Sequence, residues 1–238
     1  MPELPARSIA DVRLSEVFDR DGCPLCTQMA RSAATYMNSF LYEGVTDVGF
    51  RRELDRARGF CRRHTREVLA ANRRQSGGTL GSAILFEAIL RIRGVELEDA
   101  LASRGNARRK RLAEAARRAA CPVCDVEAKA LASAIDSFHG LASVAEWRGA
   151  IAGSPFCLDH LLALLMHRPS GEAWDEIERA QAARVRDLRA RLERFSAASS
   201  HDRRHRITAD EQRAADDAAA FLGGDSAEAA RPRKAAAD

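Results

Sequence analysis

The sequence contains CPLC at residues 23–26 and FCRRH at residues 60–64, and it repeats these motifs as CPVC at 121–124 and FCLDH at 156–160. These four short stretches hold all six cysteines of the chain. The second cysteine of each CPxC precedes the cysteine of the next FCxxH by 35 positions in the first copy and by 33 in the second. Three thiols and one histidine per copy make the ligand set of a Cys3His zinc site. We therefore predict two metal sites.

The predicted sites follow the order of the motifs along the chain. Site 1 takes its ligands from the first copy and site 2 from the second, namely Cys23, Cys26, Cys61 and His64 for site 1, and Cys121, Cys124, Cys157 and His160 for site 2. The proline of each CPxC suits the first position of a helix, which places the cysteine before it at the N-cap. The cysteine of each FCxxH opens a further helix, with its histidine on the same face three positions later. Each ion would lie between two helix N-termini, whose positive partial charges favour thiolate.

The donor set favours a structural role for two Zn²⁺ ions per chain. Four protein ligands fill the zinc tetrahedron and leave no open position for a substrate. An iron–sulfur cluster with Cys3His ligation is the alternative cofactor. A reactive CxxC pair of the thioredoxin type would need neither the CxxH motifs nor a wholly helical context. The chain also lacks HExxH, GxSxG and P-loop motifs, so we predict no catalytic residues and favour a protein that is not an enzyme.

Composition limits the cellular setting and the partners. The chain has 238 residues, of which 46% are apolar, and no apolar run of about 18 residues that would span a bilayer. The first residues, MPELPARSIADVRL, carry no secretory signal pattern, which predicts a cytoplasmic protein. The formal net charge is +4, and two Cys3His zinc sites of charge −1 each would bring it to about +2. Basic clusters alternate with acidic residues, so nucleic-acid binding is an alternative that the charge pattern does not favour.

Apolar positions recur three and four residues apart through most of the chain, which predicts an all-α fold. We expect helices over residues 9–19, 25–44, 48–58, 61–74, 80–102, 107–119, 124–139, 143–152, 157–167, 172–198 and 208–222.

The repeat predicts two helical metal-binding modules, followed by a long C-terminal helix. We expect an N-terminal segment (1–19), a first module (20–103), a basic connecting helix (104–117), a second module (118–168), C-terminal helices (172–222) and a disordered tail (223–238). One apolar stripe follows the helix at 172–198, through Trp174, Ile177, Gln181, Val185, Leu188, Leu192 and Phe195. This stripe either packs on the modules or forms a self-association seam.

A further group of polar residues lies between the last two predicted helices. His201 and His205 would face the same way in a helix, and together with Asp202 they could bind a third metal ion. The alternatives are a basic solvated turn and a contact to a partner or an anion.

Beyond these motifs, the chain resembles a bacterial family of unknown function that is defined by paired CPxC/FCxxH repeats. The resemblance rests on CPxC followed by YMNSFLYEGVTDVGFRRELDRARGFCRRH (36–64), on CPVC with SPFCLDH (154–160), and on LRARLERFSAASSHDRRHR (188–206). It covers roughly residues 20–223 and implies a helical cytosolic protein whose eight Cys and His residues named above are ligands. The chain departs from the family in having Ser199 and Ser200 before His201-Asp202 and no aromatic residue after them. The resemblance implies no reaction.

The function that these observations favour is a zinc-stabilised helical adaptor that binds another protein. Closed ligand sets, the lack of a catalytic motif and the long amphipathic C-terminal helix support it. A thiol-based sensor of metal or oxidant is the first alternative, because thiolates at helix N-termini are nucleophilic. A nucleic-acid-binding protein and an iron–sulfur protein are further alternatives.

Overall fold

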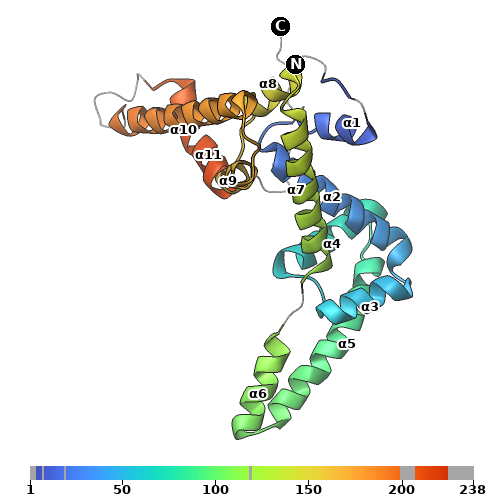
Figure 1. The fold of residues 1–238 in the computed structure, drawn as a ribbon. Helices are drawn as coiled ribbons and strands as arrows, with labels where there is room; N and C mark the ends of the chain where they lie inside the picture. Colours follow the sequence, from blue (N-terminus) through green and yellow to red (C-terminus); the bar gives the residue numbers. More distant parts are fainter. Residues whose placement is uncertain (1–3, 7, 19, 118–119, 199–206, 225–238) are drawn as a thin grey trace. The chain divides into compact units, whose positions relative to one another are not determined.

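The computed structural model describes residues 4–6, 8–18, 20–117, 120–198 and 207–224, and the regular elements in these ranges are helices without a β-strand. The all-α prediction is confirmed. Figure 1 shows α1 (Ile9–Ser15), α2 (Pro24–Ser39), the π-helical turn η1 (Phe40–Gly44), α3 (Val48–Ala57), α4 (Arg62–Ser76), α5 (Leu80–Ala102), α6 (Gly105–Ala116), α7 (Pro122–Leu141), α8 (Ala145–Gly153), α9 (Leu158–Met166), α10 (Glu172–Ala198) and α11 (Ala209–Gly223).

The chain forms two compact units that differ from the predicted modules. Unit 1 comprises residues 1–28 and 131–238, and unit 2 comprises residues 29–130. The two units are therefore nested in sequence, because unit 2 is inserted between the two parts of unit 1. α2 begins in unit 1 and ends in unit 2, whereas α7 begins in unit 2 and ends in unit 1.

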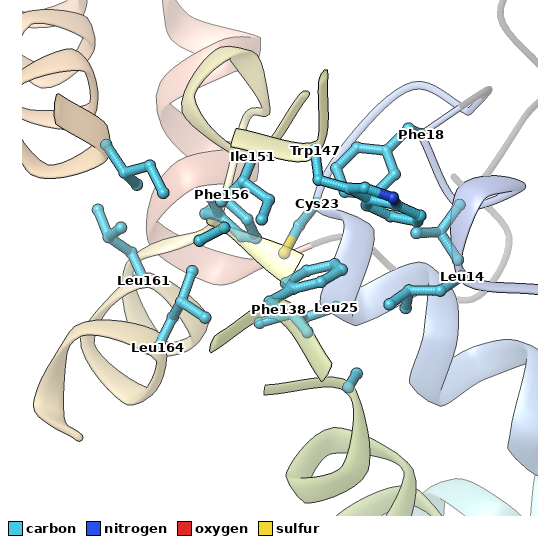
Figure 2. Packing of buried hydrophobic residues seen from close by; sticks show 14 of the residues in the cluster. Leu14, Phe18, Cys23, Leu25, Phe138, Trp147, Ile151, Phe156, Leu161 and Leu164 are labelled. Carbon is cyan, nitrogen blue, oxygen red and sulfur yellow. The ribbon is translucent and has the colours of Figure 1, made fainter. Parts of the chain in front are cut away.

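The core of unit 1 combines the N-terminal segment with helices from the second half of the chain. Phe18 lies 5.4 Å from Phe138 and 5.9 Å from Trp147 between ring centroids. Figure 2 shows these rings with Phe156 and Cys23 in one apolar cluster. The N-terminal segment is thus part of a core rather than a separate region, because burial of Phe18 removes a large apolar side chain from water.

Unit 2 has its own core around a column of aromatic rings. Phe40 stacks on Phe50 and on Phe60, with ring centroids 4.6 Å and 5.6 Å apart. α5 and α6 pack against each other within this unit as an antiparallel pair (Figure 1). The predicted connecting helix therefore forms the second arm of a helical hairpin, not a link between modules.

The apolar stripe of α10 packs inside unit 1, as the first of the two predicted alternatives states. Trp174, Ile177 and Leu188 are buried, and so is Gln181. The Gln181 side-chain amide donates hydrogen bonds to the carbonyl oxygens of Ile151, Ala152 and Ser154, at 3.3, 2.8 and 3.0 Å. Because the last carbonyls of a helix lack partners within it, Gln181 satisfies the end of α8. It thereby fixes the turn that leads to Cys157.

Candidate metal centres

The eight predicted ligands gather in two groups, but each group takes its members from both copies of the repeat. The group in unit 1 joins the first CPxC to the second FCxxH, and the group in unit 2 joins the first FCxxH to the second CPxC. Their members are Cys23, Cys26, Cys157 and His160 in unit 1, and Cys61, His64, Cys121 and Cys124 in unit 2. The predicted pairing of motifs within each copy is therefore wrong.

The courses of α2 and α7 between the two units explain the crossed pairing. α2 starts directly after Cys23 and has 16 residues, and a helix of that length spans about 24 Å. α2 begins in unit 1 and ends in unit 2, so Cys61 belongs to the other unit than the first CPxC. α7 starts directly after Cys121 and has 20 residues, so it spans about 30 Å. It returns the chain to unit 1, where Cys157 meets the first CPxC.

The local structure at each motif is the one that the sequence predicts. The carbonyl oxygen of Cys23 accepts a hydrogen bond from Thr27 N at 3.0 Å, and Cys121, Cys61 and Cys157 make the same bond to the residue four positions later. The cysteines thus occupy the N-caps of α2, α7, α4 and α9. Free backbone N–H groups and the positive end of the helix dipole favour thiolates at these positions. Each group of donors lies at the N-termini of two helices.

The spacing of the donor atoms fits a single tetrahedral ion. A zinc ion about 2.3 Å from sulfur and about 2.0–2.1 Å from nitrogen requires sulfurs about 3.8 Å apart and sulfur–nitrogen distances of about 3.5 Å. The Sγ atoms of Cys26 and Cys157 are 3.8 Å apart, and those of Cys61 and Cys124 are 3.7 Å apart. Sulfur-to-Nδ1 distances lie between 3.2 and 3.5 Å in both groups. The cysteines are free thiols at these distances, since a disulfide needs about 2.05 Å.

Carboxylates orient the histidine of unit 2. His64 is fully buried, and its Nδ1 faces the three sulfurs of its group. Its Nε2 lies 2.8 Å from Arg63 Nη2, 3.4 Å from Glu127 and 3.6 Å from Glu67. Glu127 is itself buried and forms an ion pair with Arg63. Arg63, Glu127 and Glu67 thus surround the Nε2 side of the ring and hold Nδ1 turned to the sulfurs, as polar neighbours of a ligating histidine do.

Hydrogen bonds between the donors shift the pKa values of the histidine and cysteine side chains in each group. Burial alone would lower the pKa of His64, but hydrogen bonds with Cys121 and Glu127 raise the pKa to about 10. Burial alone would raise the pKa of Cys121, and the hydrogen bond with His64 lowers it to about 6. In unit 1, hydrogen bonds with Cys23 and Cys26 hold the pKa of Cys157 far below its usual range. Each group therefore favours a thiolate that attracts a cation.

The backbone at the C-terminal end of α11 covers two thiols of unit 1, those of Cys26 and Cys157. A Cβ placed on Gly224 would lie 3.4 Å from Cys26 Sγ and 3.6 Å from Cys157 Sγ. Gly224 has a φ of +70° and a ψ of 172°, a backbone conformation that is essentially restricted to glycine. Its N–H bonds to the Ala220 carbonyl at 3.0 Å, which ends the helix at this point. A backbone without a side chain thus forms one wall of the site.

Sequence patterns did not reveal Glu127, Glu67 or Gly224 as neighbours of the sites. Glu127 and Glu67 each follow a ligand of unit 2 by three positions, one helical turn, and the matching positions of unit 1 hold Met29 and Ala163. Each copy of the repeat has one of the two glutamates, and only the crossed pairing of the motifs brings both of them to the same site. The predicted third site at His201, Asp202 and His205 lies outside the described residues.

Comparison with known proteins identifies a family. No curated protein and no solved structure matches the chain. Among the described residues, no helix has both the length and the apolar composition to cross a membrane. Residues 6–173, which are more than half of the chain and include both groups of donors, match the model of a family of unknown function (DUF6062), and the chain therefore belongs to this family.

Proposed function

We propose that the protein is a zinc-stabilised helical binding protein with one structural Cys3His zinc site in each unit. The observation that carries this proposal is the completeness of both donor groups: four donor atoms lie within 4.8 Å of one another in each. Such a group surrounds one ion and leaves no ligand position for a substrate. The sites therefore serve the fold rather than a reaction.

The same spacing favours one zinc ion over an iron–sulfur cluster. A cluster with several irons stands between its protein ligands and needs more room than a single ion. Donor atoms that are all within 4.8 Å of one another leave room for one cation at their centre. Three thiolates with one imidazole at a tetrahedral site are typical ligands of structural zinc.

The proposed partner is another protein, and α5 offers a surface for it. Leu90, Leu97 and Leu101 lie 7 and 4 positions apart, so they share one helix face. They are 67%, 49% and 52% exposed. Exposed large apolar side chains on one face are typical of protein-binding surfaces. Leu112 on α6, 39% exposed, adds to the apolar surface of the same hairpin.

Metal analysis of the full chain tests the proposal. We expect about two zinc ions and no iron in protein purified without a metal-binding tag and in the absence of oxygen. Iron with sulfide, or protein that folds without any metal, would contradict it. For the binding role, proteins retained by the wild-type chain should be lost with Leu97→Glu and kept with Glu98→Gln, an exposed neighbour on the same helix. Equal retention by both variants would remove α5 from the proposal.

A further inference from the structure

We propose that α11 is a removable cover over the metal site of unit 1, and that its docking controls how fast this site releases its ion and exposes its thiolates. The inference rests on the proposed metal binding and deepens it. Its basis is the position of Gly224, whose Cα lies so close to the site that an added Cβ would touch two of the three sulfurs. Access to Cys26 and Cys157 from this side is blocked by the end of α11.

Contacts of moderate strength hold the cover in place. α11 packs against α9 and α10, and Phe221 packs partly buried against the core of unit 1. Arg191 forms an ion pair with Asp217 at 2.7 Å, and Arg194 forms one with Glu211 at 3.0 Å. Each pair has one partner that is exposed to solvent, Asp217 and Arg194, which limits what the pair contributes. α11 buries Ala214 and packs one partly buried aromatic side chain, far less apolar surface than the core beneath it, so we expect it to open at a lower free energy than that core.

The unit 2 site is protected differently. His64 is fully buried there, and Glu127 behind it is buried as well. Both groups of donors lie within the matched family region, which ends at residue 173, whereas α11 lies beyond it. α11 thus lies outside the matched region, and it covers one of the two sites. We infer that the two ions differ in their rate of exchange and that α11 sets the rate at unit 1.

A glycine substitution with two matched controls tests the cover in the full-length, metal-loaded protein. Gly224→Val adds two methyl groups beyond a Cβ that would already be in van der Waals contact with Cys26 and Cys157, and we expect it to push the end of α11 off the site. Gly223→Val is the positional control, because nothing lies within 4 Å of its Cβ. Gly105→Val, at a φ of +55° and also in open space, controls for strain in the left-handed conformation.

Two readouts follow the unit 1 site separately from unit 2. The first is zinc transfer to a chromogenic chelator, with tryptophan emission recorded in parallel, because both tryptophans of the chain, Trp147 and Trp174, belong to unit 1. The second is alkylation by iodoacetamide, with peptide mass spectrometry comparing Cys26 with Cys124. These are the second cysteines of the two CPxC motifs and are both partly exposed.

In Gly224→Val we expect zinc loss from unit 1 and alkylation of Cys26 to be about tenfold faster, equivalent to about 1.4 kcal/mol in the free energy of opening. Unit 2 and both control variants should match the wild type. Unchanged rates at unit 1, or equal acceleration at both units, would overturn the cover. Wild-type protein that binds no zinc would instead refute the proposed function. The cover would still be tested in that case, by comparing the alkylation rate of Cys26 between the metal-free wild type and metal-free Gly224→Val.

Discussion

Double substitution of the ligands separates the crossed pairing of motifs from the sequential one. In the structure, Cys26 and Cys157 belong to one group, with their sulfurs 3.8 Å apart, and Cys61 belongs to the other. The variant Cys26→Ser/Cys157→Ser therefore removes two donors from unit 1 and none from unit 2. The variant Cys26→Ser/Cys61→Ser removes one donor from each. Sequential pairing would assign these two outcomes the other way round.

The expected effect is large because the binding free energy of a structural zinc ion is comparable to the whole free energy of unfolding of a small domain. Apparent zinc-binding free energies are about 10–16 kcal/mol, whereas whole domains are stable by about 5–15 kcal/mol. A unit that loses its ion should therefore unfold. In the Cys26→Ser/Cys157→Ser protein, unit 1 should unfold and unit 2 should keep its full set of donors.

Zinc content after dialysis against a mild chelator is the assay. We expect about one ion per chain in Cys26→Ser/Cys157→Ser and well below one in Cys26→Ser/Cys61→Ser. Tryptophan emission should shift to the red in the first variant, since Trp147 and Trp174 lie in the core of unit 1. Loss of both ions from the first variant, together with retention of one ion by the second, would refute the crossed arrangement.

Three further outcomes are expected. Glu127→Gln should weaken zinc binding at unit 2 by about 10–100-fold, because it removes the carboxylate that orients His64, and competition titration with a chelator should show no change at unit 1. Phe138→Ala, at a fully buried position, should destabilise unit 1 by about 3–5 kcal/mol in denaturant titrations followed by tryptophan emission. Phe60→Ala should leave that tryptophan transition in place, because Phe60 packs in the core of unit 2. Excess chelator should abolish the cooperative unfolding of the wild-type chain in calorimetry, and an unchanged transition would show that the metal does not hold the fold.

Much of the local structure follows from the sequence alone. The spacing of apolar residues gave α5 at 80–102 and α10 at 172–198 as the structure has them. The prolines after Cys23 and Cys121 predicted that these cysteines are helix N-caps. The prediction is confirmed, because the carbonyl oxygen of each cysteine accepts a hydrogen bond from the backbone N–H four residues later. These features depend on neighbours within one or two turns, so a short stretch of sequence contains the information that determines them. The choice of cysteine and histidine as donors was readable for the same reason.

The partners of those donors were decided by tertiary structure. Two CPxC and two FCxxH motifs in alternating order are compatible with sequential and with crossed pairing, and the motif spacing does not distinguish them. The structure decides between them: α2 begins in unit 1 and ends in unit 2, α7 begins in unit 2 and ends in unit 1, and each FCxxH therefore lies in the other unit than the CPxC that precedes it. The approach of Gly224 to Cys26 and Cys157 is likewise a contact between residues distant in sequence. The sequence by itself determined which residues bind and where the helices start, whereas packing of distant segments determined which residues bind together.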